Sequence, residues 1–166
     1  MALLPLRFFG DPVLTTRAEE VTSFDEALGQ LIADMTETMH AEGGIGLAAN
    51  QVGVLRRVFV YDVDGVAGHI VNPVWQRVGD DTDVVAEGCL SIPDIRADVQ
   101  RPTTIQMSGV DMTGRPVSMQ ATGMLARCMQ HESDHLDGVL FVKRLAPADR
   151  KQAMAEIRHA EWFLNR

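Results

Sequence analysis

Two histidines that stand four residues apart carry the clearest chemistry in this sequence. On a helix, His131 and His135 would lie one turn apart on the same face, so that one metal ion could bind both imidazoles. Glu132 would then be held next to the metal, where it could move a proton to or from a bound water. Residues 131–135 therefore predict a hydrolytic metal centre that still needs a third ligand.

The segment Glu87-Gly88-Cys89-Leu90-Ser91 offers that ligand. The commonest role of a cysteine is that of a small buried hydrophobe, but Cys89 stands in a glycine-containing bend where a core residue gains little. A thiolate there would complete a Cys-His-His set and leave the fourth tetrahedral position for water. This set would accept zinc, iron or cobalt, so the softness of the ligands does not choose the metal.

A third segment, Gly44-Ile45-Gly46-Leu47-Ala48-Ala49-Asn50-Gln51, is weaker by itself. Most glycine-rich segments are turns, and this one lacks the spacing and the Lys-Ser/Thr pair of a phosphate-binding loop. Its functional interpretation is a backbone that can approach a peptide substrate closely, with Gln51 as an amide donor.

Length and composition set the class of protein. With 166 residues, 46% of them hydrophobic, the chain can bury a sizeable core, and we expect one domain over residues 1–166. No apolar run is long enough to cross a membrane. The first ten residues lack the basic start and the small-residue cleavage site of a secretory signal, so we expect a cytoplasmic protein.

The charge of the chain is unevenly distributed. The net charge of −8 argues against a nucleic-acid binder. Residues 143–166 hold six basic and three acidic side chains, a balance of +3, which leaves −11 for the rest. This basic segment could contact an acidic partner, although a solvated helix face is the simpler interpretation.

Apolar periodicity predicts three helices. Ser23-Phe24-Asp25-Glu26 has the pattern of a capping box, and apolar residues at helical spacing follow it from Phe24 until Glu42-Gly43-Gly44. A second helix is expected over residues 123–136, with a glycine at its end. Pro147 opens a last helix that runs on through Trp162 and Phe163.

Short strands are expected between the first two helices. β-rich segments and turn residues place them at 58–63, 69–71, 74–78, 103–110 and 116–121. The turns are expected at Asp64-Gly65 and at residues 111–114. The order of elements describes an α+β fold of antiparallel strands packed around a central metal-binding helix, with N-terminal and C-terminal helices.

Together the three segments resemble the peptide deformylase family. That family carries Gly-x-Gly-x-Ala-Ala-x-Gln, Glu-Gly-Cys-Leu-Ser and Gln-His-Glu-x-Asp-His-Leu in this order, and here they stand at residues 44–51, 87–91 and 130–136. No signature position departs from the pattern. The resemblance extends to Gly10-Asp11-Pro12-Val13-Leu14 and to the closing helix, which looks like that of the bacterial form with a helical C-terminus.

The resemblance implies an enzyme that removes the formyl group from the N-terminal formyl-methionine of new polypeptides and releases formate. By analogy, Cys89, His131 and His135 bind one divalent metal ion, which is usually Fe²⁺ in the family, with Zn²⁺, Ni²⁺ or Co²⁺ as substitutes. Glu132 would take a proton from the attacking water and pass it to the leaving amine.

The resemblance also assigns the groups around the substrate. The side-chain amide of Gln51 and the backbone N–H of Leu90 would stabilise charge on the formyl oxygen, and Gly46 would pair with the peptide backbone. Glu87 and Arg101 resemble an ion pair that braces the cysteine loop. The pocket for the methionine side chain and the downstream residues would be lined by Ile45, Val85, Met124, Arg127 through its methylene stem, Cys128 and Arg96.

The partners implied by the resemblance are N-formyl-methionyl peptides and the ribosome near its exit tunnel. We expect the basic C-terminal helix to dock there, so that truncation after Ala146 would weaken ribosome association while small-peptide turnover survives. We also expect a monomer, no membrane partner and no sequence-specific binding of nucleic acid.

Two other functions compete with this one. A zinc peptidase often takes its third ligand downstream of the second histidine, and Glu156 stands at such a separation from His135. A peptidase would leave the segments around Cys89 and Gln51 without a role. A non-catalytic, metal-stabilised module that binds N-termini would predict damage to Glu132 or Gln51, and both are intact.

Overall fold

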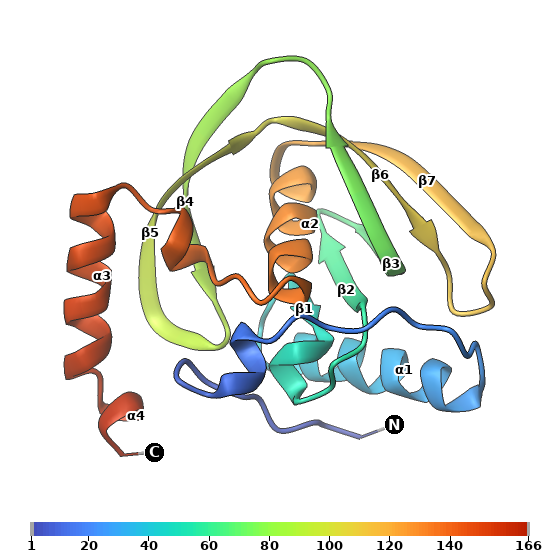
Figure 1. The fold of residues 1–166 in the computed structure, drawn as a ribbon, viewed down its shortest axis with the longest axis horizontal. Coiled ribbons are helices and arrows are strands. Elements are labelled where there is room, and N and C mark those ends of the chain that lie inside the picture. The colour runs from blue at the N-terminus through green and yellow to red at the C-terminus, as the bar shows by residue number, and fades with distance from the viewer. Residues whose placement is uncertain (1, 166) are drawn as a thin grey trace.

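In the computed structural model, which describes residues 2–165, two antiparallel sheets enclose a central helix (Figure 1). Five strands pair in the order β1-β2-β3-β6-β7, and the other two form a β4–β5 hairpin. The strands are β1 (Gly46–Ala48), β2 (Val58–Val63), β3 (Val66–Arg77), β4 (Thr82–Cys89), β5 (Ile92–Pro102), β6 (Thr104–Val110) and β7 (Pro116–Thr122). The helices are α1 (Glu26–Ala41), α2 (Gly123–Leu136), α3 (Pro147–His159) and α4 (Glu161–Leu164), with short 3₁₀ helices η1 (Pro12–Thr15), η2 (Ala49–Val52) and η3 (Phe141–Arg144).

The central helix α2 is buried on all sides over most of its length. Every residue from Ala126 to Leu136 is buried, including its charged side chains. On one side Ala126 and Met129 pack against Phe59 and Met107 of the larger sheet, and α2 also contacts β5 of the hairpin. The motif predicted from the two histidines therefore lies inside the molecule, which confirms the expected α+β fold around this helix.

The alternation of side chains along β2 lets helices cover both faces of the larger sheet. Phe59 and Tyr61 belong to the hydrophobic cluster that includes α2. Val58 and Val60 point the other way and pack with Met35 of α1. Because both faces are covered, the first four residues of β2 are apolar and buried, and the predicted bounds of the strand are confirmed.

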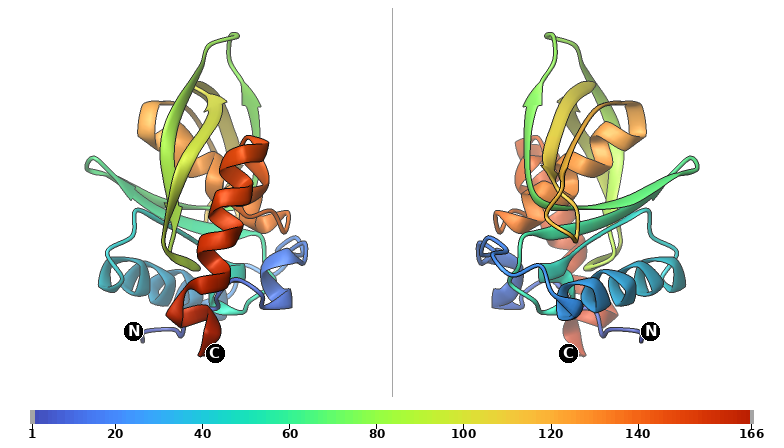
Figure 2. Two further views of the ribbon diagram at one scale, coloured as in Figure 1. Left: turned by 90° about the vertical axis from the view of Figure 1, so that its left-hand side faces the viewer. Right: turned by 90° about the vertical axis from the view of Figure 1, so that its right-hand side faces the viewer.

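The C-terminal helix α3 lies along the outer face of the β4–β5 hairpin (Figure 2, left). Its Ala153 and Ile157 are buried and pack with Ile92, Val99 and Phe141 in a third hydrophobic cluster. Truncation after Ala146 would remove part of this core, so it cannot separate docking from folding.

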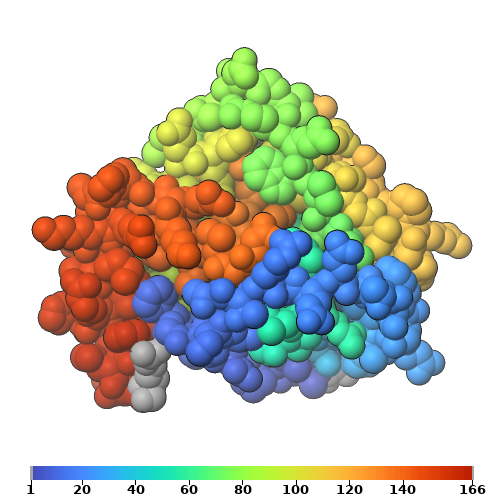
Figure 3. Space-filling model, viewed as in Figure 1, coloured from blue at the N-terminus to red at the C-terminus, as the bar shows by residue number. Residues whose placement is uncertain are grey.

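The N-terminal segment covers the end of α2. The amide of Ala18 donates to the carbonyl of Leu136 at 2.8 Å. Arg57 reaches the same carbonyl at 2.8 Å and also pairs with Asp137. In the space-filling view this segment (blue) lies directly against the segment that follows α2 (orange) (Figure 3). The carbonyl of Leu136 at the end of α2 is thereby satisfied by protein donors, while those of residues 133–135 accept from the amides of residues 137–139.

Several sequence-based expectations were wrong in detail. Asp25 rather than Ser23 caps α1, because its carboxylate accepts from the Leu28 amide at 3.0 Å, and Phe24 is 40% exposed instead of belonging to the apolar face. The predicted strands at 69–71 and 74–78 are one strand, β3, with an irregularity between Val71 and Val74. The last helix breaks at Ala160, so that α4 carries Trp162 separately.

The strands of the hairpin were not individually predicted. β4 begins with three exposed residues and has one buried residue, Glu87, while β5 alternates only in part. Both strands also carry charged side chains that find partners only in the fold. No helix in the described part of the chain has the length and apolar character needed to cross a membrane.

Replacing Ile157 by Ala should lower the free energy of unfolding by about 2–5 kcal/mol, because it removes a fully buried side chain from the interface of α3 and β5. Urea unfolding followed by circular dichroism would measure the change. The exposed neighbour Arg158→Ala is the matched control and should stay within about 0.5 kcal/mol of wild type. Equal stability of the two variants would contradict the packing role of α3.

Candidate metal centre and active site

Three side chains from two elements bring their ligand atoms together. Cys89 Sγ lies 3.3 Å from His135 Nε2, which lies 3.2 Å from His131 Nε2. The three ligand atoms all lie within 4.8 Å of one another. A tetrahedral ion with bonds of about 2.0–2.3 Å to nitrogen and sulfur holds its ligand atoms about 3.3–3.6 Å apart. The cluster therefore has the spacing and the donor types of a metal site.

The two elements that carry the ligands meet at their ends. His131 and His135 are one turn apart on α2. Cys89 is the last residue of β4, where it pairs with Ile92 across the turn Leu90–Ser91. The register shifts between Gly88 and Cys89, and this bulge turns the end of the strand away from the regular ladder.

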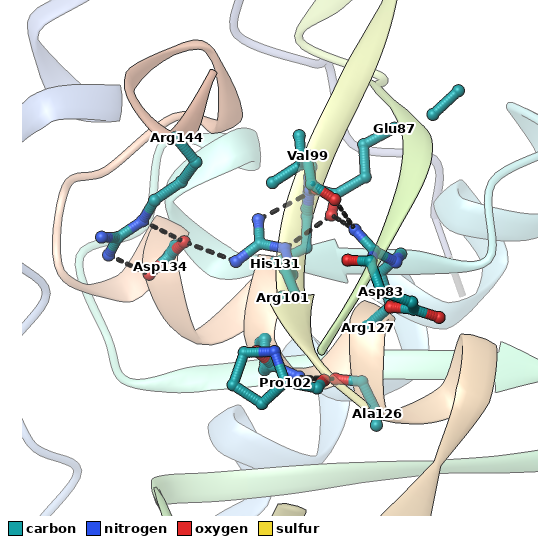
Figure 4. Close-up of polar contacts among 12 residues, drawn as sticks. Asp83, Glu87, Val99, Arg101, Pro102, Ala126, Arg127, His131, Asp134 and Arg144 are labelled. Atoms are coloured by element: carbon teal, nitrogen blue, oxygen red, sulfur yellow. Dashed lines mark hydrogen bonds and ion pairs between the residues drawn. The ribbon is translucent and has the colours of Figure 1, made fainter. Parts of the chain in front are cut away.

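Glu87 fixes the orientation of His131 (Figure 4). Its Oε1 accepts from His131 Nδ1 at 2.9 Å and from Arg101 at 2.9 Å, and its Oε2 accepts from Arg127 at 2.6 Å. Burial alone would raise the pKa of Glu87, but the hydrogen bonds from His131 and Arg101 and the positive charge of Arg101 lower it to about 2. An ionised carboxylate only accepts, so the proton of the neutral imidazole stays on Nδ1 and Nε2 is free for a metal.

The same network continues to the surface through Asp134. Arg101 donates to Asp134 at 3.0 Å, and Arg144 holds the other side of that carboxylate with two hydrogen bonds of 2.9 and 3.2 Å. The two buried acids are thus each paired with arginines, as buried charges require. His135 lacks such a brace among the described residues, since its buried Nδ1 has no hydrogen-bond partner.

Glu132 is a buried carboxylate beside the cluster with an unused oxygen. Its Oε1 has no partner among the described residues. The pKa of Glu132 is raised to about 7, mainly by burial and further by the negative charge of the neighbouring Glu87. An acid in this state can both hold and release a proton near neutral pH.

Gly46 leaves Glu132 and Cys128 the space that they occupy. A Cβ atom at Gly46 would come within 2.6 Å of Glu132 Oε2 and 2.7 Å of Cys128 Sγ. Only glycine lets β1 approach α2 this closely. The pKa of the Cys128 thiol is raised by burial and by the charge of Glu132, so it stays protonated and forms part of the wall rather than of the ligand set.

The amide of Gln51 is locked in one orientation. Its Oε1 accepts from the Ala48 amide at 3.0 Å, while its Nε2 donates to Ser91 Oγ at 3.1 Å and lies 3.6 Å from Cys89 Sγ. The N–H side of this buried amide therefore faces the cluster, where a developing negative charge would need a donor. Ser91, which sequence analysis did not single out, is the group that holds it there.

A cavity of about 970 Å³ opens in front of the cluster. It is lined by most of the residues that the sequence suggested, namely Ile45, Gly46, Gln51, Glu87, Cys89, Leu90, Arg96, Met124, Arg127, Cys128, His131 and Glu132. It is also lined by residues that sequence analysis missed, among them Leu6, Phe8, Pro93 and Asp94. The hydrophobic pattern of residues 3–9 did not predict that Leu6 and Phe8 line a cavity, because the same pattern is typical of ordinary core packing.

Val85 lies apart from the other residues suggested for the pocket. Of the described residues of β4, Ala86, Glu87, Gly88 and Cys89 line this cavity, and Val85 is not among its lining residues. The reason is Arg127, which reaches the carbonyl of Val99 at 2.8 Å and the carboxylate of Asp83 at 2.8 Å and so fills the space between α2 and this part of β4.

The zinc peptidase ligand set does not form. Glu156 is exposed on α3, where its carboxylate accepts from Gln152 at 3.0 Å. In the part of the chain that the structure describes, the group of potential ligands is Cys89, His131 and His135. The glutamate is a surface residue of an amphipathic helix, as its position on α3 requires.

Comparisons with known proteins agree with this geometry. A family model described as Polypeptide deformylase matches residues 3–151. Peptide deformylase 1 of Corynebacterium efficiens is 59% identical over 167 residues, covering 98% of this chain and 99% of that protein. The peptide deformylase of Acidothermus cellulolyticus is 53% identical over 162 residues, covering 98% and 89%.

Solved structures give the same result. A peptide deformylase from Synechococcus elongatus in complex with actinonin has a TM-score of 0.89 and 40% identity, with 96% of this chain and 90% of that chain covered. The peptide deformylase from Thermotoga maritima has a TM-score of 0.85 and 43% identity, with 87% and 99% covered.

Replacing Glu87 by Gln should weaken metal binding about 10- to 100-fold, because His131 loses the charged acceptor that orients it. Competition with a chelator, read as metal per folded chain, would measure the loss. Asp83→Asn is the matched control, since Asp83 also binds Arg127 but is half-exposed and has no contact with His131. A metal affinity in Glu87→Gln that equals that of the control would contradict this role.

Proposed function

The chain belongs to the peptide deformylase family, and we propose that Glu132 carries the proton in its reaction. The enzyme removes the N-formyl group from the N-terminal formyl-methionine of new polypeptides and releases formate. The family implies a divalent metal ion for this activity. Cys89, His131 and His135 would hold it, and a bound divalent ion lowers the pKa of water and polarises a carbonyl oxygen.

The observation that carries this proposal is the unpartnered Oε1 of buried Glu132 beside the three ligand atoms. Glu132 takes a proton from water as the water oxygen bonds to the formyl carbon. It then gives the proton to the peptide nitrogen as the carbon–nitrogen bond breaks, so that formate and a free amine leave. Burial supports this exchange because it keeps the pKa of Glu132 close to neutral.

The negative charge that develops on the formyl oxygen needs donors that are already in place. We assign this role to the Gln51 side-chain amide and the Leu90 backbone N–H. The hydrogen bonds from Ala48 and to Ser91 hold the Gln51 amide in the required direction at no cost during the reaction. We assign to Gly46 the pairing with the peptide backbone, and the position of β1 at an edge of the larger sheet supports this role.

The methionine side chain of the substrate would enter the apolar part of the cavity. Ile45 and Met124 are exposed there at 46% and 41%, and the neutral thiol of Cys128 lies deeper. Arg127 offers only its methylene stem, because its guanidinium group is bound to Glu87, Asp83 and Val99. Arg96 donates to the Ala86 carbonyl at 3.1 Å and could contact residues downstream of methionine.

We propose Fe²⁺ as the native metal, with Zn²⁺, Ni²⁺ or Co²⁺ as substitutes. The Cys-His-His donor set supports any of these ions, since thiolate and imidazole suit each of them. We also propose that the chain acts as a single-domain monomer in the cytoplasm, where chains are made. The contacts of α2 with both sheets support a single core.

The ribosome is the proposed docking partner of α3. Arg150, Lys151 and Arg158 are exposed on this helix, while Ala153 and Ile157 fix its other face to the hairpin. A basic face on a rigidly attached helix suits an RNA-rich surface.

The Glu132→Gln enzyme should lose about 10²–10⁴-fold in formate release from a formyl-Met-Ala-Ser peptide, because the amide cannot carry a proton. The assay compares it with wild type at one metal ion per chain, after anaerobic loading with Fe²⁺. Glu156→Gln is the matched control and should match wild type, since this glutamate is exposed on α3. Full turnover by Glu132→Gln would reject the proton-carrier role, and loss of metal by Glu156→Gln would favour a peptidase.

Charge reversal on α3 should weaken binding to purified ribosomes without changing turnover of small peptides. The double variant Arg150→Glu/Lys151→Glu reverses two of these charges. For each phosphate contact that it loses, the plot of log affinity against log salt concentration should become less steep by about 1. Co-sedimentation at several salt concentrations would measure it. Arg115→Glu, an exposed residue of the β6–β7 turn, is the control with an equal charge change per residue. Identical salt dependence in all three proteins would reject docking through α3.

A further inference from the structure

The short helix α4 ties the C-terminal end of the chain to the cavity wall. The indole N–H of Trp162 donates to the carbonyl of Pro93 at 3.0 Å, across 69 positions of sequence. The Trp162 ring lies 6.2 Å from that of Phe8. Phe163 lies 6.2 Å from Phe9 in the same way. α4 therefore touches both the N-terminal segment and the β4–β5 hairpin.

Both partners of Trp162 line the cavity in front of the metal cluster. Phe8, which is 39% exposed, and Pro93 are lining residues. A cavity of about 970 Å³ is at the upper end of the usual range for sites that take small ligands, about 300–1,000 Å³. It can therefore hold several substrate residues besides formyl-methionine, and Phe8 and Pro93 are available to contact them.

The hairpin needs an external anchor at this point. Gly88 pairs with Arg96 and Cys89 pairs with Ile92, so that Pro93, Asp94 and Ile95 have no register partner in β4. Asp94 adopts a positive φ of 65°, which non-glycine residues rarely do. Residues without a ladder partner are fixed in part by contacts from outside the ladder. The hydrogen bond from Trp162 is one such contact at its first residue.

We propose that Trp162 is a positioning residue for the part of the cavity that binds substrate residues downstream of formyl-methionine. This proposal rests on the proposed function of the site. Trp162 does not line the cavity itself, so it acts through Pro93 and Phe8. Its loss should weaken the binding of longer peptides and leave the chemical step at the formyl group unchanged.

Trp162→Phe keeps an aromatic ring against Phe8 and removes the N–H that binds Pro93. For metal-loaded enzyme, we expect KM for formyl-Met-Ala-Ser-Ala to rise about 3- to 10-fold. This is the change in affinity that corresponds to the net free energy of one hydrogen bond. KM for formyl-Met-Ala and kcat for both peptides should stay at the wild-type values. Leu164→Ala, a 64% exposed residue of the same helix, is the matched control and should change neither constant.

The comparison of two peptide lengths separates this proposal from the function of the site. Turnover of formyl-Met-Ala by wild type tests the function alone. Three outcomes would overturn the role of Trp162. They are an equal change of KM for both peptides, a lower kcat with loss of metal, and no change in either constant.

The fluorescence of Trp162 gives a second measurement that does not depend on substituting it. Trp75 is the other tryptophan of the chain and lies in β3, outside the lining of the cavity. In a Trp75→Phe enzyme, the product peptide Met-Ala-Ser-Ala should shift the Trp162 emission at concentrations that inhibit turnover, whereas Met-Ala should not. Emission that responds to neither peptide, or equally to both, would overturn the proposal.

Discussion

The carboxylate of Glu87 is the interaction on which the arrangement of the site depends. It is buried, and it accepts hydrogen bonds from His131 of α2, Arg101 of β5 and Arg127 of α2. A buried charge is tolerated only when it is paired in this way, and removal of one partner leaves the others unpaired. The same bonds that compensate Glu87 therefore hold the hairpin against the helix and present Nε2 of His131 to the metal.

The side chains of the site come from three parts of the fold. The hairpin brings Cys89 and the brace from Glu87, and α2 brings both histidines and Glu132. The larger sheet contributes Gly46 at its edge, and Gln51 follows in η2. Because α2 packs against both sheets and η2, its contacts connect the three parts of the fold that carry these side chains. Preorganised donors of this kind need no rearrangement when charge develops.

The sequence predicted most of the chemistry and less of the framework. The spacing of His131 and His135 is a property of one helix, and a local pattern is sufficient to predict it. Cys89 was assigned from its glycine-containing bend, where burial alone did not explain it. The roles of Ser91, Asp134 and Arg144 depend on contacts between segments far apart in sequence, which no local pattern encodes. The break at Ala160 and the contact of Trp162 with Pro93 were missed for the same reason, since α3 and α4 form one continuous helical pattern.

The origin of the three ligands also bears on the order of events as the chain folds. His131 and His135 can meet an ion as soon as α2 forms, but Cys89 is 42 positions away and joins them only after the hairpin has docked on that helix. Contacts of such high sequence separation form late, because loop closure must precede them. A complete ligand set is thus a property of the finished fold. An ion that needs all three ligands binds the folded state more tightly than the unfolded chain, and this difference in binding free energy adds to the stability of the folded molecule.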